Sequence, residues 1–259
     1  MRKVVPFLFF PLLLIADDSM FENPAIPAFS SKFSFLLGHK IWLCDTSHSS
    51  VKISIPWRGC SFGCGLRYLN YGKIKETTHD NKDGTGRMYT ADDASLALNF
   101  AIRPKNEFSL GGNINFIQET IDDVKANGAS FDIGVILNPS LARWFFLEGT
   151  IKNITLKKPS FIKEERSIPK ELKLGFQIKK EPINFRFDIL RENDLDFMVG
   201  FKWFTQSILS FSARYKSIDI GNLDFGISLM IDKYRVEYNY FPNSVSDCYS
   251  ILFGIEYKR

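Results

Sequence analysis

The sequence is poor in several features that mark other classes of protein. It contains 5 Met, 4 Cys and 3 His in 259 residues, and its formal net charge at pH 7 is only +4. Four cysteines do not form a disulfide-rich scaffold, and no basic cluster indicates a nucleic-acid partner. Beyond the N-terminus, no uncharged apolar run reaches the roughly 18 residues of a membrane helix. A helical membrane bundle and a nucleic-acid-binding protein are therefore excluded.

No group of side chains predicts catalysis. His39, His48 and His79 have no cysteine or carboxylate at the spacing of a zinc site or of a nucleophile–base pair. The carboxylate pairs Asp92–Asp93 and Asp122–Asp123 are expected in loops, where such pairs are usually hydrated. We therefore expect no enzyme activity, no catalytic residue, no cofactor and no metal.

Aromatic residues are abundant in this chain. It contains 25 Phe and 9 Tyr, and aromatic residues make up 15% of the sequence. Large aromatic side chains fit the pleated, half-buried surface of a β-sheet. The hydrophobic content of 45% exceeds that of a disordered chain. The composition therefore favours an all-β protein.

The N-terminus has the order of parts found in a secretory signal. Met1–Lys3 is basic, Val4–Ile15 is apolar, and the small residue Ala16 precedes two aspartates. The apolar part is too short to span a membrane as an anchor. We predict that residues 1–16 are a signal peptide. The alternative is a buried strand or helix at a misassigned gene start.

Alternation of apolar and polar residues with period two recurs from residue 32 to the end, which indicates β-strands. It predicts about fourteen antiparallel strands in one domain, residues 32–259, an even number typical of outer-membrane barrels. The predicted strands are 32–43, 50–56, 61–71, 95–103, 108–120, 129–138, 142–153, 171–179, 183–190, 195–204, 208–216, 222–231, 233–241 and 248–258.

The predicted connections alternate between short turns and mostly longer loops, which is the pattern of a transmembrane β-barrel. The longer ones include 72–94, 121–128 and 154–170. A soluble barrel also alternates, with its apolar face inward, but about fourteen strands enclose more space than apolar side chains fill. We therefore predict a transmembrane barrel with outward apolar faces. Large aromatics near the predicted strand ends favour this topology: Trp57, Trp203, Tyr215, Tyr234, Tyr240, Tyr249 and Tyr257.

Several motifs resemble the PorV/PorQ-type outer-membrane proteins, relatives of the FadL-like barrels. The resemblance extends from residue 17 onward, and its motifs are Asn23–Pro24–Ala25, 66–72, 110–134, 236–242 and 250–257. It implies that residues 17–31 form a short N-terminal segment, a reduced form of the family's hatch. The Gly/Ala-rich segment that usually precedes the motif is missing, and Ile26 replaces the usual glycine.

The resemblance implies an exported protein of the bacterial outer membrane that handles or transports hydrophobic or amphipathic small molecules. Its partners would be outer-membrane lipid and such a ligand. One alternative is an accessory of type IX-like protein secretion, a cargo shuttle, with the loops 73–93 and 155–170 contacting secretion-machinery or cargo proteins. The other alternative is a structural barrel without cargo.

If the apolar faces meet lipid, cations outnumber carboxylates on the predicted inner face. We hypothesise that this face favours anionic or amphipathic solutes. The alternative is a network of mutually paired charges that makes the wall rigid. The candidate binding residues are Arg67, Arg103, Arg186, Lys202, Arg214 and Arg235.

Cysteine and glycine positions give two further expectations. Cys44 directly follows the first predicted strand and Cys248 begins the last, and these strands are neighbours in a closed barrel, so a disulfide between the two cysteines is one hypothesis and two free thiols the other. Cys60 and Cys64 would lie about 13 Å apart along one strand, too far to pair. Glycines recur on the inner face, and we expect them to relieve curvature rather than admit a ligand.

Overall fold

The computed structural model describes residues 20–30, 32–42, 46–78, 80–161, 164–192, 194–205, 208–217, 223–242 and 248–258. The predicted signal peptide and Cys44 lie outside these residues, as does the side chain of Cys248. The signal and the Cys44–Cys248 disulfide therefore stay predictions, whereas Cys60 and Cys64 are free thiols. Among the described residues, no helix is long and apolar enough to cross a bilayer.

Fourteen antiparallel strands form a closed barrel in which β1 pairs with β16, which confirms the predicted fold class. A separate two-stranded hairpin, β8 (Ser160–Phe161) and β9 (Glu164–Glu165), lies in the connection after β7. The barrel strands are β1 (Lys32–Ile41), β2 (Ser47–Trp57), β3 (Cys60–Lys75), β4 (Met88–Lys105), β5 (Phe108–Ile121), β6 (Val124–Leu137), β7 (Phe145–Lys157), β10 (Glu171–Lys180), β11 (Ile183–Arg191), β12 (Leu195–Thr205), β13 (Leu209–Lys216), β14 (Leu223–Ile231), β15 (Tyr234–Phe241) and β16 (Cys248–Lys258).

The apolar side chains point out of the barrel and the polar side chains point in. In β14, Phe225 and Ile227 are 47% and 49% exposed, whereas Asp224 and Ser228 are 4% and 7% exposed. An apolar outer face with a polar inside is the pattern of a barrel that spans a bilayer. A barrel folded around an apolar core would have the reverse pattern.

Large aromatic side chains lie on the outer face close to the short turns. Trp57 ends β2, Trp203 lies near the end of β12 and Tyr234 begins β15, and all three are exposed. Tyr215 lies at the opposite end, close to the end of β13. Aromatic rings at both ends of the apolar band agree with the interfacial girdles of membrane barrels.

The predicted strand bounds are wrong at the end that carries the longer connections. β4 begins at Met88 rather than Ser95, and β6 begins at Val124 rather than Ala129. The predicted loop 72–94 is therefore shortened to residues 76–87, and the predicted loop 121–128 is reduced to a turn at residues 122–123. Both faces of these extensions carry polar residues, so the alternation that marks a strand is lost there.

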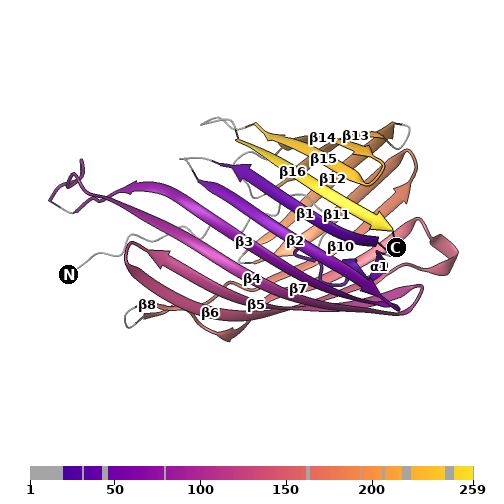
Figure 1. Cartoon of the computed structure of the whole chain (residues 1–259), viewed down its shortest axis with the longest axis horizontal. Coiled ribbons are helices and arrows are strands. Elements are labelled where there is room, and N and C mark those ends of the chain that lie inside the picture. The colour runs from indigo at the N-terminus through magenta and orange to yellow at the C-terminus, as the bar shows by residue number, and fades with distance from the viewer. Residues whose placement is uncertain are drawn as a thin grey trace.

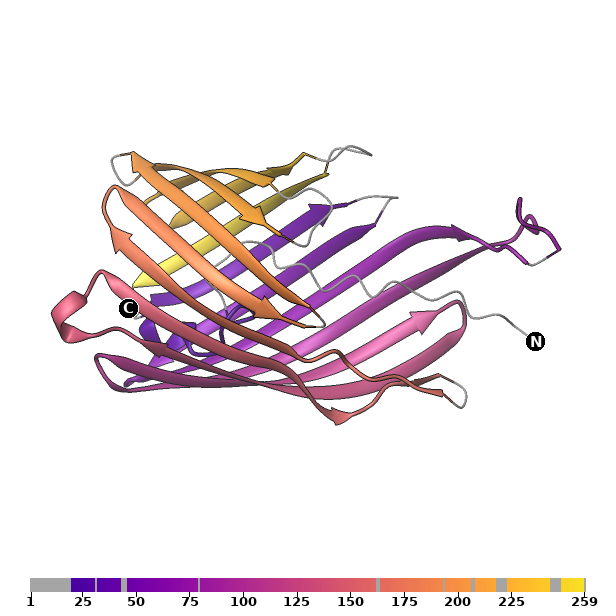
Figure 2. The same ribbon diagram turned by 180° about the vertical axis from the view of Figure 1, so that it is seen from behind.

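The wall is taller in the N-terminal half of the barrel than in the C-terminal half. Figure 1 shows β3 and β4 extending beyond the neighbouring strands, and Figure 2 shows the shorter strands from β10 onward from behind. At the other end the turns are tight. Arg58 and Gly59 have φ of 47° and 80°, the left-handed geometry that closes a two-residue hairpin between β2 and β3.

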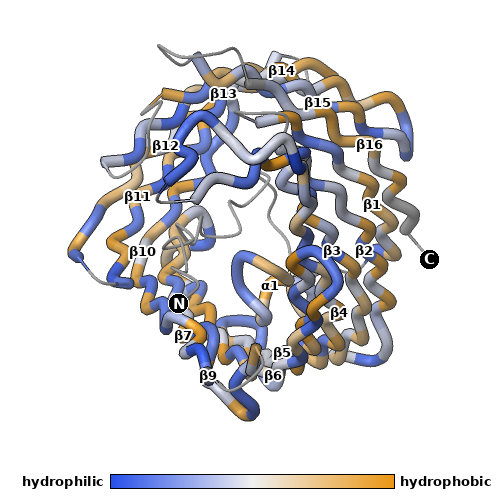
Figure 3. Tube along the Cα trace, turned by 90° about the vertical axis from the view of Figure 1, so that its left-hand side faces the viewer, coloured by the Kyte–Doolittle hydropathy of each residue, from blue (hydrophilic) through white to orange (hydrophobic). Residues whose placement is uncertain are grey.

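The N-terminal segment, defined here as Met20–Ser30, lies inside the barrel. Its short helix α1 (Ile26–Phe29) has a proline in the first turn, where no backbone N–H is needed. Figure 3, seen from one end, shows α1 within the ring of strands, and the helix contacts β2, β3, β4 and β5. The inside of the barrel is thus partly filled by the chain itself.

Candidate functional site

The predicted motif Asn23, Pro24 and Ala25 fixes the N-terminal segment to the barrel wall. The Asn23 side-chain amide donates to the Val135 carbonyl oxygen at 3.1 Å, and its oxygen accepts the Ala25 backbone N–H at 3.0 Å. From the wall, Asn99 donates to the Pro24 carbonyl oxygen at 3.0 Å. Asn23 and Ala25 have no solvent exposure. A buried donor or acceptor that loses its partner costs free energy. The motif is therefore held at the one place on the wall where these hydrogen bonds are made.

Four glycines of the wall make room for this segment. A Cβ at Gly111 would collide with the Pro24 backbone, and one at Gly134 would collide with the Asn23 side chain. Added carbons at Gly63 and Gly65 would meet the Met20 side chain. These four inner-face glycines thus admit the close approach of another part of the chain, a role that the expectation of curvature relief rather than ligand approach did not include.

Arg186, on β11, links the N-terminal segment to the opposite part of the wall. Its guanidinium lies 3.0 Å from Glu22, 3.1 Å from Glu148 and 2.7 Å from Asp188. All four side chains are buried or nearly so, with Glu22 only 3% exposed. A planar guanidinium with several donors is suited to hold more than one carboxylate. Arg186 therefore couples the position of Glu22 to two strands.

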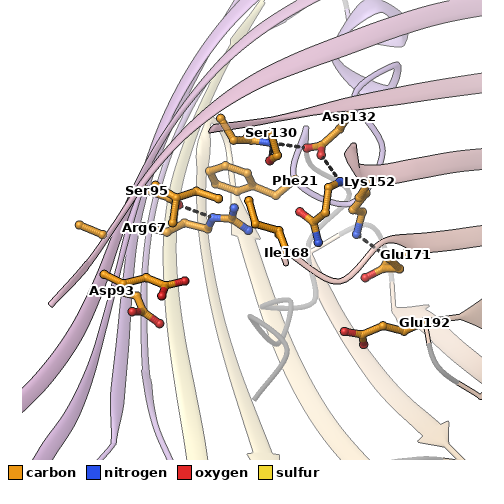
Figure 4. A pocket seen from close by; sticks show the side chains of 15 residues that line it. Phe21, Arg67, Asp93, Ser95, Ser130, Asp132, Lys152, Ile168, Glu171 and Glu192 are labelled. Carbon is orange, nitrogen blue, oxygen red and sulfur yellow. Dashed lines mark hydrogen bonds and ion pairs between the residues drawn. The ribbon is translucent and has the colours of Figure 1, made fainter. Parts of the chain in front are cut away.

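A cavity of about 80 Å³ lies beside the N-terminal segment (Figure 4). Phe21 of the segment forms one side, and Ile168 comes from the connection between β7 and β10. The charged residues that line the cavity are two cations and five carboxylates: Arg67, Lys152, Asp93, Glu119, Asp132, Glu171 and Glu192. The cavity is thus bounded by the N-terminal segment, the wall and an inward-folded loop.

The loop that carries Ile168 is held from the wall. Asn153 donates from its side-chain amide to the Pro169 carbonyl oxygen at 2.9 Å, and Ile168 is only 6% exposed. Within the loop, the Arg166 backbone N–H donates to the Pro159 carbonyl oxygen at 2.9 Å. Arg166 also brings its guanidinium 3.8 Å from Glu119 in the cavity wall. The loop therefore contributes Ile168 to the cavity lining.

Asp132 organises the centre of the cavity wall. One carboxylate oxygen accepts the side-chain amides of Asn113 and Asn115 at 3.2 and 2.8 Å, and the other accepts the Asn153 backbone N–H at 2.9 Å. Asn153 has φ of 60° and interrupts the β6–β7 ladder. The carboxylate thus accepts a hydrogen bond from the Asn153 backbone N–H, which has no partner strand because of the bulge in the ladder.

Burial affects Glu192, which lies between β11 and β12 at the edge of the cavity. Partial burial and the nearby carboxylates Glu171 and Asp196 raise the pKa of Glu192. Its carboxylate has no hydrogen-bond or ion-pair partner among the described residues. The negative potential at this edge is therefore only partly compensated.

Of the six cations predicted as binding residues, only Arg67 lines the cavity. It donates to the Ser95 hydroxyl at 3.1 Å, with its guanidinium 4.3 Å from the centre of the Phe21 ring. The other five contact neighbouring groups. Their contacts are Arg103 with the Asn106 carbonyl oxygen, Arg186 with three carboxylates, Lys202 and Arg235 with Glu237, and Arg214 with Asp224.

Sequence reasoning did not identify Asp132 as a hub, nor Asn99, Asn113 and Ile168 as site residues. Asn99 and Asn113 were detectable in principle, because each occupies an inward position of an alternating strand, where a polar side chain needs a partner. Ile168 carried no signal, since its role depends on the path of a loop.

No family model and no curated protein matches the sequence. Solved structures match the fold. The toluene transporter TodX from Pseudomonas putida has a TM-score of 0.72 and 10% identity, covering 94% of both chains. A FadL homologue from Pseudomonas aeruginosa has a TM-score of 0.60 and 10% identity, covering 93% of this chain and 94% of that chain. At such identities the likeness shows the fold alone.

Proposed function

We propose that this chain is an exported barrel of the bacterial outer membrane that carries hydrophobic or amphipathic small molecules across that membrane. The observation that carries the proposal is the cavity lined by Phe21 of the N-terminal segment and by Ile168 of the inward loop. A cavity bounded by an N-terminal segment and a loop lets a molecule pass when one of the two moves.

Two further observations support transport. The outer face of the strands carries a band of exposed apolar side chains that can contact lipid, and the two compared proteins of the same fold are a toluene transporter and a FadL homologue. We propose that the N-terminal segment acts as a reduced hatch of a PorV/FadL-like barrel. The hatch would be displaced from the glycine-lined wall when a ligand passes.

The secretion accessory and the cargo-free structural barrel are the alternatives. One of the two loops proposed as a protein-binding surface, 155–170, folds inward at Ile168 instead of presenting all its residues outward. Part of the other, 73–93, belongs to the strands β3 and β4. Both observations leave less loop surface for a protein partner, which favours the transporter.

Uptake by whole cells tests the proposal. The full chain is produced in a Gram-negative strain that lacks its own hydrocarbon uptake barrel, and entry of radiolabelled toluene and hexanol is measured. Ser95→Phe fills the cavity, in whose wall Ser95 is 5% exposed, and Ser228→Phe places the same ring on the inner face of β14, outside the cavity lining. We expect faster uptake with the parent chain and with Ser228→Phe, and background uptake with Ser95→Phe. Background uptake with the parent chain would overturn the proposal.

A further inference from the structure

The charges that line the cavity do not balance. Five carboxylates face it, whereas Arg67 and Lys152 are the lining cations among the described residues. The sign is opposite to the excess of cations that the sequence predicted for the inner face as a whole. A ligand in this cavity therefore meets an environment dominated by hydrogen-bond acceptors.

The lining cations already have partners. Lys152 places its ammonium 2.8 Å from a carboxylate oxygen of Glu171, and Arg67 donates to the Ser95 hydroxyl. Figure 4 shows Lys152 directed at Glu171 and Arg67 directed at Ser95. Both cations therefore already contact groups of the protein, and neither is directed at the space that a ligand carboxylate would occupy.

Two of the lining carboxylates are only partly satisfied by the protein. Asp93 accepts the Tyr71 hydroxyl at 2.7 Å, and Glu119 has Arg166 at 3.8 Å, a distance longer than a hydrogen bond. Asp93 and Glu119 are directly opposite one another in the β4–β5 ladder, so their negative charges lie close together. Like charges at that spacing favour a cation between or beside them.

Two acceptors have no partner among the described residues. They are the side-chain oxygen of Asn115, a lining residue that is 2% exposed, and the carboxylate of Glu192, which is only partly buried. Figure 4 shows Glu192 and Asp93 on opposite sides of the cavity. A buried acceptor without a donor is costly, and a ligand that supplies several N–H donors removes that cost.

Apolar surface lies in the same cavity. Phe21, Ile117 and Ile168 contribute an aromatic ring and two branched aliphatic side chains to its lining. The volume of about 80 Å³ accommodates several water molecules or the head and first carbons of a small organic ion. The lining thus combines acceptors for a charged head with surface for a hydrocarbon body.

We propose that the cavity binds the ammonium head of an amine-bearing amphipathic molecule, with its hydrocarbon body against Phe21 and Ile168. This proposal rests on the proposed function and names the substrate class of the same site. The ammonium donates to Glu192, and Glu119 and Asp93 on the other side of the cavity add to the negative potential that holds it; a charge-assisted hydrogen bond of this kind is about twice as strong as a neutral one. A neutral hydrocarbon leaves these acceptors unpaired, and a carboxylate is repelled by them.

Equilibrium dialysis of the purified full chain in a nonionic detergent tests the proposal with three matched probes, hexylammonium, hexanol and hexanoate. The probes share one chain length and differ in the head group alone, and empty micelles give the background. We expect hexylammonium to bind roughly tenfold more tightly than hexanol, because a tenfold difference in affinity corresponds to about one charge-assisted hydrogen bond. Hexanoate should bind most weakly.

Two variants locate the binding. Glu192→Gln should weaken hexylammonium binding by roughly tenfold and leave hexanol binding unchanged, because it removes charge but keeps an acceptor of the same shape. Glu181→Gln, in the exposed turn at residues 181–182, removes the same charge at the other end of the barrel and should change neither value. A shift in gel mobility on heating shows that both variants are folded.

The outcomes distinguish this proposal from the proposed function. Equal binding of hexylammonium and hexanol, or tightest binding of hexanoate, overturns the amine preference and leaves transport intact. An amine preference that Glu192→Gln does not change also overturns it, because the head then lies elsewhere. Absence of binding by all three probes, together with background toluene uptake, overturns the proposed function itself.

Discussion

Arg186 on β11 and Glu22 in the N-terminal segment form an ion pair inside the barrel, with 3.0 Å between the guanidinium nitrogen and the carboxylate oxygen. The two residues are separated by 164 positions in the sequence. The pair joins the segment to β11, whereas the four glycines that contact the segment lie on β3, β5 and β6. The segment is therefore fixed on two sides of the barrel interior, by close packing on one and by charge on the other.

Removal of the Arg186 charge should release the segment. Arg186→Gln leaves Glu22, Glu148 and Asp188 as buried carboxylates without their shared cation, and breaking a buried pair in this way costs about 3–5 kcal/mol. We expect a lower midpoint of denaturant unfolding and faster proteolysis near residue 20. Limited proteolysis of the folded barrel in detergent measures the second effect.

Arg191→Gln is the matched control for this variant, because Arg191 ends the same strand and is exposed. It should unfold and be cleaved as the parent chain does. Unchanged cleavage of Arg186→Gln near residue 20 would show that the glycine-lined contacts alone hold the segment.

The glycine contacts make a separate prediction. Gly134→Ala places a carbon into the Asn23 side chain, and overpacking of this kind typically costs about 1–3 kcal/mol. We expect the segment to shift away from β6 and to exchange its backbone amide hydrogens faster. Hydrogen exchange followed by mass spectrometry measures the protection of peptides that contain Ala25.

Gly200→Ala controls for the loss of a wall glycine. The nearest atom to a new carbon at residue 200 is the Arg186 Cβ at 3.8 Å, which is ordinary contact. This variant should match the parent chain in exchange and stability. Equal protection of the segment in the Gly134 and Gly200 variants would mean that the wall adjusts without displacing Asn23.

The sequence predicted the barrel because the bilayer imposes the same rule on every strand. An apolar residue at every second position, as at Phe225 and Ile227, is required wherever a strand crosses lipid. Above that band the rule no longer holds. Asp92, Asp93 and Lys125 are strand residues with no apolar alternation around them, so the extensions of β4 and β6 were predicted as loops.

The cavity was beyond sequence reasoning for a different reason. Alternation shows which residues face inward, but not which strands place them at the same height. Asp93 and Glu119 become neighbours only through the β4–β5 register. Two ion pairs could be predicted from the sequence. Arg186–Asp188 and Arg235–Glu237 are each two residues apart on one strand, and residues at that spacing lie on the same face.

Glu192 predicts a pH dependence of stability. Its partial burial and the neighbouring Glu171 and Asp196 raise its pKa in the folded protein. A carboxyl that binds its proton more tightly when folded stabilises the fold at low pH, and this contribution is lost as the pH rises through the folded-state pKa. Glu192→Gln should therefore raise the unfolding temperature at pH 8 by about one or two degrees and have little effect at pH 4.

The midpoint of the heat-induced gel shift, taken at both pH values, measures this difference. Glu181→Gln again controls for the loss of one negative charge. A stabilisation by Glu192→Gln that is equal at pH 4 and pH 8 would contradict the prediction, because it would not follow the titration of this carboxyl.

Ile227 tests the direction in which the strands face. It lies in the middle of β14 and is 49% exposed on the outer face, where the proposed environment is hydrocarbon. Ile227→Arg should lower the stability of the barrel refolded in lipid vesicles by about 2–4 kcal/mol, the effect of a cation near the bilayer midplane. Thr77→Arg, just beyond the end of β3 and exposed, should have no effect beyond about 0.5 kcal/mol.

Denaturant titration of both variants in vesicles, followed by tryptophan fluorescence, compares the two positions. Equal stabilities would place Ile227 in water, which no barrel that spans a bilayer permits at that position.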